Sequence, residues 1–127
     1  MRRFLVAFAL AAAACATDVA PAPVGGLLPL VLDAPRDTDG AIIITVSGGP
    51  IDSVTAAPGY DITSSTDASG IHLLVVGPLA SGTLAQIHVS DLAHAGQYVA
   101  SVEQIADGTT FALLDPAPYR VRVAAPR

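Results

Sequence analysis

The chain has 127 residues, of which 52% are hydrophobic and only 13% are charged, and its formal net charge at pH 7 is −5. This length fits one ordinary domain, and the aliphatic content is high enough for a packed core, which excludes a wholly disordered chain. The acidic balance disfavours a nucleic-acid-binding protein, because such proteins need a basic face, and a single Cys excludes an internal disulfide framework.

The N-terminal residues have the pattern of an export signal. Two Arg follow Met1, and residues 4–14 form an apolar run that is too short to span a bilayer as a helix, which needs about 20 residues. The run ends in Leu-Ala-Ala-Ala-Ala-Cys, and Cys15 is the only Cys of the chain. This ending resembles the lipobox of bacterial lipoproteins, with Ala12 where that family most often has Leu. The resemblance implies a helical signal peptide over residues 1–14, cleavage before Cys15 and a lipid on its sulfur.

The same residues predict where the mature protein is located. Ala16 stands where an Asp in bacterial lipoproteins implies retention at the inner membrane, so the resemblance implies an outer-membrane anchor facing the periplasm or the surface. The alternative is ordinary secretion, with cleavage after Ala14 or after Ala16. Cleavage before Cys15 leaves four Arg against eleven acidic residues, a net charge of −7. That charge argues against binding of anionic lipid by the domain itself.

Residues 15–26 are small, Pro-containing and nearly uncharged, and we expect them to form a flexible tether between lipid and domain. In residues 27–125, short β-rich runs alternate with turn signals. The expected strands are residues 27–33, 41–46, 51–56, 60–63, 71–76, 83–90, 98–105, 110–114 and 119–123. Many short strands with regularly spaced turns predict an all-β fold, a single antiparallel β-sandwich.

Local patterns agree with this interpretation. Arg120 and Arg122 alternate with apolar residues, which indicates a strand with one wet face, whereas the three Ile of residues 42–44 indicate a central strand. Gly77-Pro78 is predicted to form a turn, and Asp107-Gly108 to form the type I′ turn of a hairpin. Only residues 90–97 are expected to hold a helical turn.

Residues 59–91 resemble the middle of cohesin-type sandwich modules. Those modules contain a strand of the form Gly-x-Leu-Ala-x-Ile-x-Val, and the matching residues here are Gly82, Leu84, Ala85, Ile87 and Val89. The resemblance covers about a third of the mature chain. It implies a cohesin-like jelly roll or an immunoglobulin-like sandwich, and it carries over no partner-binding residue.

Asp37 and Asp39, in the run Asp-Thr-Asp-Gly, are weak candidates for calcium ligands. A loop of the EF-hand type needs a third oxygen ligand and a bidentate Glu about twelve residues after the first ligand. The only Glu of the chain is Glu103, far outside that spacing. We therefore expect a solvated turn at this position, with no metal and no other cofactor.

The sequence contains none of the familiar catalytic motifs, and it contains no Lys, which excludes Lys nucleophiles. His72, His88 and His94 lack the short spacing of zinc sites and are expected to be exposed or hydrogen-bonded. We therefore expect a protein that is not an enzyme. Convergence of a His with an Asp and a Ser in a cleft would instead favour a small secreted hydrolase.

The mature chain has four aromatic residues that bear on sugar binding, namely Phe111 and three Tyr. Tyr60, Tyr98 and Tyr119 each stand near the start of an expected strand, where a ring commonly caps the core while its hydroxyl bonds the backbone. The alternative for these rings is an exposed platform for a carbohydrate.

The sequence as a whole predicts a lipid-anchored, non-catalytic module of the cell envelope. We expect it to bind a protein or polysaccharide, or to serve a structural role, through loops or a strand edge. It would contact the membrane through the lipid on Cys15 and would have no nucleic-acid partner. A carbohydrate-binding module is the first alternative, and a small secreted hydrolase is the second.

Overall fold

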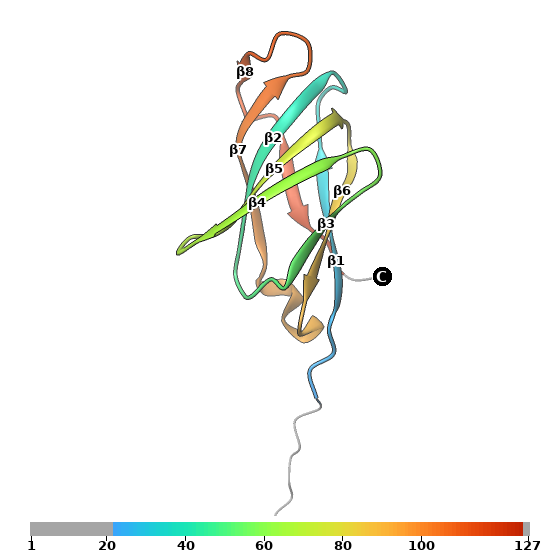
Figure 1. The fold of residues 1–127 in the computed structure, drawn as a ribbon, viewed down its shortest axis with the longest axis vertical. Coiled ribbons are helices and arrows are strands. Elements are labelled where there is room, and N and C mark those ends of the chain that lie inside the picture. The colour runs from blue at the N-terminus through green and yellow to red at the C-terminus, as the bar shows by residue number, and fades with distance from the viewer. Residues whose placement is uncertain (1–21, 126–127) are drawn as a thin grey trace, which may run out of the picture.

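The computed structural model describes residues 22–125, which form nine β-strands and one short 3-10 helix (Figure 1). The elements are β1 (Gly26–Asp33), β2 (Asp39–Ser47), β3 (Ser53–Ala56), β4 (Asp61–Asp67), β5 (Gly70–Leu79), β6 (Gly82–Val89), η1 (Leu92–Gln97), β7 (Val99–Asp107), β8 (Leu113–Leu114) and β9 (Arg120–Val123). The expected signal peptide and Cys15 lie outside the described residues. In the described part of the chain, no helix is long and apolar enough to cross a membrane.

The strands form two sheets that pack against each other as a sandwich (Figure 1). The four-stranded sheet has the order β3-β6-β1-β9, and the five-stranded sheet has the order β4-β5-β2-β7-β8. Neighbouring strands pair in antiparallel fashion throughout. The predicted all-β antiparallel sandwich is therefore confirmed, and β2, which contains the three consecutive Ile, is the central strand of its sheet.

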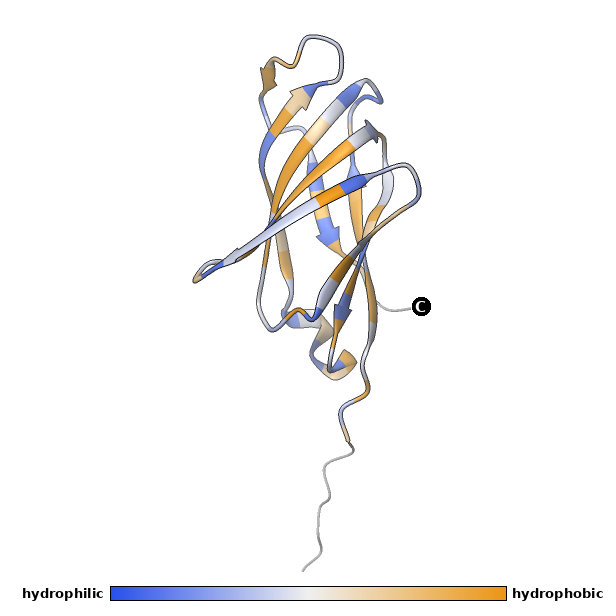
Figure 2. Ribbon diagram, in the orientation of Figure 1, coloured by the Kyte–Doolittle hydropathy of each residue, from blue (hydrophilic) through white to orange (hydrophobic). Residues whose placement is uncertain are grey.

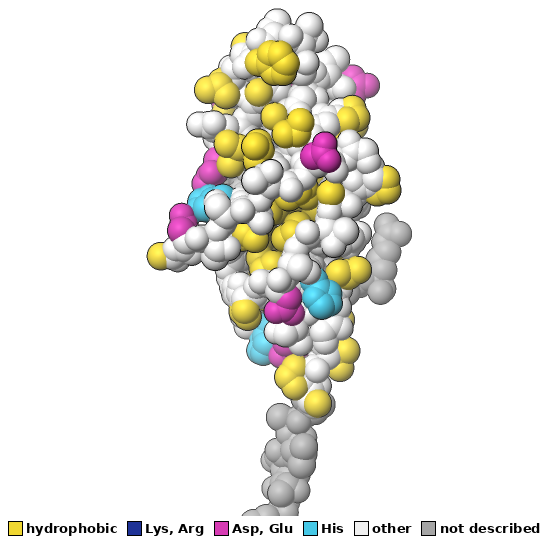
Figure 3. All heavy atoms as spheres, viewed as in Figure 1, with side chains coloured by type: hydrophobic (Ala, Val, Ile, Leu, Met, Phe, Trp, Pro, Cys, Tyr) yellow, Lys and Arg dark blue, Asp and Glu magenta, His cyan; other side chains and the backbone are white. Residues whose placement is uncertain are grey.

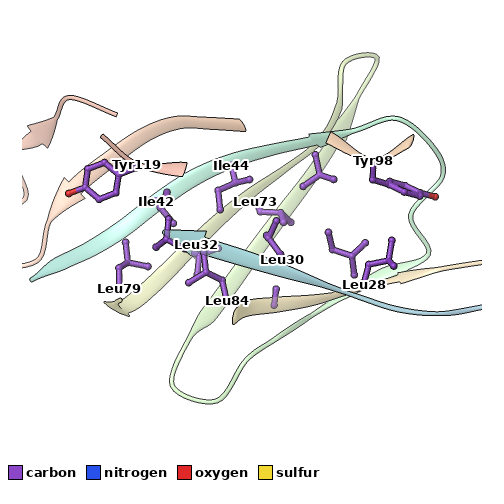
Figure 4. Packing of buried hydrophobic residues seen from close by; sticks show 14 of the residues in the cluster. Leu28, Leu30, Leu32, Ile42, Ile44, Leu73, Leu79, Leu84, Tyr98 and Tyr119 are labelled. Carbon is purple, nitrogen blue, oxygen red and sulfur yellow. The ribbon is translucent and has the colours of Figure 1, made fainter. Parts of the chain in front are cut away.

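The hydrophobic core lies between the two sheets, because successive side chains of a strand point to opposite faces. In β1, Leu28, Leu30 and Leu32 are fully buried. Figure 4 shows Leu30 and Leu32 near Ile42 and Ile44 of β2, which come from the opposite sheet, and Leu28 further along β1 toward Tyr98. The alternation of hydrophobic and polar residues along the strands (Figure 2) is the pattern that places one face of each sheet in the core.

The expected helical turn is confirmed as η1. Asp91 precedes it in an extended conformation, and its carboxylate accepts a hydrogen bond from the backbone N–H of Ala93 at 3.0 Å. Such capping satisfies one of the donors that a helix start leaves unpaired. Directly after the cap, the N–H of Leu92 donates to the carbonyl of Val24 at 2.8 Å. Contacts with the domain therefore begin at Val24, inside the segment expected to be a free tether.

Several strands are longer than the sequence pattern predicts, and β4 and β5 extend furthest at their C-terminal ends. β4 continues through Ser64, Ser65 and Thr66, and β5 continues through Gly77-Pro78 to Leu79, so the predicted turn at Gly77-Pro78 is wrong. Gly77 has a φ of +155°, and a Cβ there would lie 2.7 Å from the carbonyl oxygen of Gly59. The glycine therefore admits the close approach of a neighbouring chain segment instead of reversing the chain.

The hairpin predicted at Asp107-Gly108 exists, but its turn is not of type I′. β7 pairs with the two residues of β8 across a longer loop, in the register Ala106–Leu113 and Ile105–Leu114. Gly108 lacks the positive φ that a type I′ turn requires. Its N–H instead donates to the carbonyl of Thr38 at 3.0 Å, which ties this loop to the connection between β1 and β2.

Candidate functional site

The outer face of the five-stranded sheet carries an exposed hydrophobic surface. Ile43 of β2 lies opposite Leu74 of β5, and Val76 and Leu113 lie on the same face one row further along. Phe111 lies two residues before Leu113, in the loop that precedes β8, and we group it with these residues under the name outer apolar patch. Figure 3 shows hydrophobic side chains gathered over this end of the sheet. The patch therefore combines residues from three strands and one loop.

The patch stands out because large hydrophobic side chains seldom gather on a solvated face. The described residues include seven exposed large hydrophobics, and four of them belong to the patch. Phe111 is the most exposed, at 79%, followed by Leu113 at 69%. A shallow groove of about 70 Å³ lies among Ile43, Leu74 and Leu113. A contiguous exposed apolar surface of this kind usually marks an interaction site.

The loop that presents Phe111 is held by its own hydrogen bonds. The carboxylate of Asp107 accepts from the backbone N–H of Thr109 at 2.7 Å and of Thr110 at 3.3 Å, and the Phe111 N–H donates to the Asp107 carbonyl at 3.1 Å. Phe111 has a φ of 59°, the only positive φ of a non-Gly residue in residues 22–125. Such backbone strain costs of order 1 kcal/mol and is concentrated at functional sites. The loop therefore holds an aromatic ring in solvent at an energetic cost.

A buried polar network lies behind this loop. The side chain of Asp39 has no solvent exposure; it accepts from the Tyr119 hydroxyl, and the Arg36 guanidinium donates to it at 2.8 Å. Arg36 also reaches Asp107 at 3.2 Å, which links the network to the Phe111 loop. The hydrogen bond to Asp39 raises the pKa of Arg36, and burial, with Asp39 beside it, raises the pKa of Tyr119. The network thus joins both sheets to the loop.

The backbone hydrogen bonds from Thr109 and Thr110 are also the main reason that the pKa of Asp107 is lowered. Asp107 is therefore held as a carboxylate that both shapes its loop and pairs with Arg36. The loop and the buried network stabilise each other through this one side chain.

The structure separates the two weak calcium candidates. Asp37 is exposed, whereas Asp39 is buried with its carboxylate oxygens taken up by Arg36 and Tyr119. Among the described residues, no three His, Cys, Asp or Glu side chains converge in a way that could hold a metal ion. Asp37 and Asp39 therefore do not form a common site.

A second polar network crosses the outer face of the same sheet. His72 of β5 lies between two carboxylates: its Nε2 is 2.8 Å from Asp67, and its Nδ1 is 3.4 Å from Glu103. Thr45 of β2 contacts His72 Nδ1 at 3.0 Å and donates its own hydroxyl to Glu103. Four neighbouring strands each contribute one side chain. Thr45 and His72 lie directly opposite each other, whereas Asp67 is paired with Gly70 and Glu103 lies at the register shift of β7, so these two carboxylates reach His72 from beside its row.

The contact between His72 and Asp67, with Ser69 beside it, brings together the residue types of a hydrolytic triad. Ser69 Oγ lies 3.3 Å from His72 Nε2, and Asp67 and Ser69 line a groove of about 460 Å³ between residues 47–51 and 66–71. In a triad the imidazole stands between its partners, with the nucleophile on one ring nitrogen and the acid on the other. Here Asp67 and Ser69 share the same nitrogen, and the Ser69 hydroxyl donates to Asp67 at 2.5 Å. This geometry favours a charge-paired imidazolium over a general base.

The pKa shifts of Asp67 and His72 agree with a charged pair. The hydrogen bonds from Ser69 and His72 lower the pKa of Asp67 to about 2, and the hydrogen bond to Asp67 raises the pKa of His72 above its ordinary 6.5. A raised histidine pKa stabilises the fold fully below about 6.5, and this stabilisation is lost as the pH rises through the folded-state pKa. The lowered pKa of Asp67 stabilises the fold fully above the ordinary value of 3.8, and this stabilisation is lost as the pH falls toward about 2.

We therefore expect the pair to stabilise the domain most between about pH 4 and pH 6.5. The melting temperature of a His72→Gln variant should differ most from that of the wild type in this window, and the difference should shrink toward about pH 9. Thermal unfolding followed by circular dichroism across this range checks the prediction, with His88→Gln as the control outside the network. A difference that stays constant with pH would show that the ion pair contributes nothing.

The remaining His and Tyr residues have local partners. His88 lies 3.7 Å from Asp52, and His94 lies 3.2 Å from Asp91. The Tyr60 hydroxyl donates to the Pro78 carbonyl at 3.0 Å, and the Tyr98 hydroxyl donates to the Pro50 carbonyl at 2.6 Å. Tyr119 differs from the expectation, because its hydroxyl bonds the Asp39 side chain instead of the backbone. Tyr98 and Tyr119 are buried, and Tyr60 is partly buried, so the three do not form an exposed platform.

Sequence reasoning missed the residues that distinguish this surface. Phe111 and Leu113 were expected in one strand, where an apolar residue would point into the core. Arg36 carried no signal, because its partners Asp39 and Tyr119 are brought together only by the fold. The His72 pair could have been found, since Asp67 and Ser69 flank a predicted turn just before His72.

Comparisons of the chain with protein-family models, with curated proteins and with solved structures found no match.

Proposed function

We propose that this protein is a lipid-anchored, non-catalytic protein-binding module of the bacterial cell envelope. The observation that carries the proposal is the outer apolar patch, in which Phe111 is strained and exposed yet fixed by a hydrogen-bonded loop. Protein interfaces draw most of their binding energy from a few aromatic and aliphatic side chains that a partner desolvates. A preorganised ring lowers the entropy lost on binding.

Two features support protein binding over the alternatives. Sugar-binding platforms use several exposed aromatic rings, whereas Phe111 is the only exposed Phe or Tyr ring among the described residues and the three Tyr rings are buried or partly buried. For hydrolysis, His72 would have to accept a proton, whereas its contacts with Asp67 and Glu103 favour the protonated ring. The function proposed is therefore binding, with a cohesin-like or immunoglobulin-like sandwich as its scaffold.

The binding surface is tested by Phe111→Asn in cells of the native host. Asn tolerates positive φ, so the variant should keep its stability or gain up to about 1 kcal/mol. A photo-crosslinking amino acid at Leu113, which is 69% exposed, should capture a protein in the wild-type background. We expect at least a fivefold loss of that adduct with Phe111→Asn.

The matched control is Val99→Asn, since Val99 is 61% exposed but lies outside the patch. It should leave the adduct unchanged. An adduct that survives Phe111→Asn, or falls equally with both variants, would count against the patch as the binding surface.

The anchor is tested at Cys15. Acylation by two or more chains gives stable membrane anchoring, whereas one chain is marginal. Wild-type protein should take up a fatty-acid probe and fractionate with membranes, and Cys15→Ser should abolish the label and release the protein or block its maturation. Wild-type protein without label, with a mature N-terminus at Ala16 or Thr17, would make it a freely exported domain instead.

A further inference from the structure

β4 is the long free edge of this sandwich. Among the described residues it pairs only with β5, in continuous register from Asp61–Val76 to Asp67–Gly70. The other edge strands are shorter: β3 and β9 have four residues each and β8 has two, whereas β4 has seven. A seven-residue edge presents a row of unpaired backbone donors and acceptors to solvent.

β4 has few of the features by which edge strands usually prevent pairing. Such edges carry charged side chains, Pro or a β-bulge; β4, Asp-Ile-Thr-Ser-Ser-Thr-Asp, has no Pro, Lys or register shift, and its charges are limited to the Asp at each end. Only Ile62 is partly buried; the other six residues are exposed. Figure 1 shows the far end of the β4–β5 hairpin projecting beyond the body of the sandwich, where another chain could reach it. The edge is therefore open to strand addition.

The outward side of this edge has a carboxylate at each end, Asp61 and Asp67, and the Asp67 carboxylate is paired with His72. Asp61, Thr63, Ser65 and Asp67 alternate on the outer face, since they lie opposite Val76, Leu74, His72 and Gly70 of β5. Asp61 forms no ion pair with another described residue, and Figure 3 shows no Lys or Arg on this face of the described part. Opposite charges on neighbouring strands are favourable. An added strand should therefore present cationic side chains on this side.

The inward side chains of β4 are Ile62, Ser64 and Thr66, and of these Ile62 is partly buried. Figure 3 shows a hollow between β4 and β3 with hydrophobic side chains in it. Ile62 of β4 and Val54 of β3 are partly buried residues packed against the core at these two edges. The inward side chains of a strand added to β4 would enter this hollow and bury further apolar surface. They should therefore be aliphatic.

We propose that β4 binds an extended protein segment in which basic or polar residues alternate with aliphatic ones, so that this segment becomes a sixth strand of the five-stranded sheet. Backbone hydrogen bonds supply the pairing, and the alternate side chains supply the specificity. The proposal rests on the proposed protein-binding function, but it concerns a different surface from the outer apolar patch.

The charges of β4 disfavour a second copy of this chain as the occupant. Symmetric antiparallel pairing of two β4 strands about Ser64 would bring Asp61 of each copy opposite Asp67 of the other. Like charges directly opposite each other destabilise strand pairs. A basic segment from another protein would instead place cations opposite Asp61 and Asp67, where the charges attract.

The probe is the peptide acetyl-Lys-Val-Thr-Val-Thr-Val-Lys-amide, whose two cations have the same spacing as Asp61 and Asp67. Its binding to the purified full-length protein is measured by fluorescence anisotropy, and the contact is located by hydrogen exchange. We expect protection of the β4 amides, weaker binding at high salt, and at least tenfold weaker binding by the same peptide with Glu in place of Lys.

Asp61→Lys should weaken binding of the Lys peptide at least fivefold, whereas Asp37→Lys, the same charge change at an exposed loop residue, should leave it nearly unchanged. Equal binding of both peptides, protection at the outer apolar patch instead of β4, or dimerisation of the protein through β4 would each overturn the proposal. If the Phe111-dependent crosslink forms while the peptide does not bind, strand addition is wrong and the proposed function stands. Absence of a Leu113 crosslink in the wild-type background would count against the proposed function separately.

Discussion

Replacing Leu30 with alanine is expected to lower the free energy of unfolding by about 3–4 kcal/mol. Leu30 has no exposed surface, and it lies in β1, an inner strand of the four-stranded sheet. Its side chain faces the opposite sheet across the core (Figure 4). Alanine therefore removes buried methyl groups and leaves a cavity that the close-packed strands on either side cannot fill. Urea unfolding with an unchanged m-value measures the loss.

Val31→Ala is the matched control, because Val31 is the next residue of the same strand and is only partly buried, on the opposite face. We expect a loss of about 1 kcal/mol or less for this variant. Equal losses for the two variants would contradict the placement of the core on the Leu30 side of β1.

Replacing Asp39 with alanine is expected to cost about 3 kcal/mol. The variant leaves the buried Tyr119 hydroxyl without its acceptor and removes the partner of Arg36. Breaking a buried ion pair from one side costs about 3–5 kcal/mol, but the Arg36 side chain is 40% exposed. Water can therefore solvate the released guanidinium, so the expected loss of stability lies at the lower end of that range. Chemical unfolding of the variant checks the value.

Asp37→Ala is the control for this experiment, since Asp37 is an exposed residue two positions away. Its effect should stay within about 0.5 kcal/mol of zero. Tyr119→Phe removes only the hydroxyl and should cost about 1–2 kcal/mol. A negligible loss for Asp39→Ala would mean that Asp39 is solvated and that the buried network does not form in solution.

Local periodicity was sufficient for most of the fold. The alternation around Arg120 and Arg122 predicted a strand with one wet face, and the three Ile of residues 42–44 predicted a central strand. The hydrophobic pattern failed where only backbone pairing with a neighbouring strand keeps the chain extended. Ser64, Ser65 and Thr66 have no apolar alternation, and they are extended because β5 pairs with them.

The candidate surfaces were less predictable, because they depend on contacts between distant residues. The sequence predicts a solvated turn at Asp39. In the structure Asp39 is buried and accepts a hydrogen bond from Tyr119, 80 residues later in the chain. The exposure of Phe111 depends on a loop whose shape is set by the Asp107 carboxylate and not by hydrophobic pattern. Neither the patch nor the open edge could be predicted from composition, because both depend on how distant strands pair.

The pairing of β1 has a consequence for when this domain can fold. β1 lies between β6 and β9, so the first strand completes its sheet only after the last strand is available. Domains dominated by such distant pairings fold in milliseconds to seconds, slowly for their size, because the chain must close long loops before any contact compensates for the lost entropy. A ribosome or a membrane channel that still holds the C-terminal residues keeps β9 from pairing. The strand order therefore delays folding until the whole chain is released, which suits a polypeptide whose N-terminus carries the pattern of an export signal.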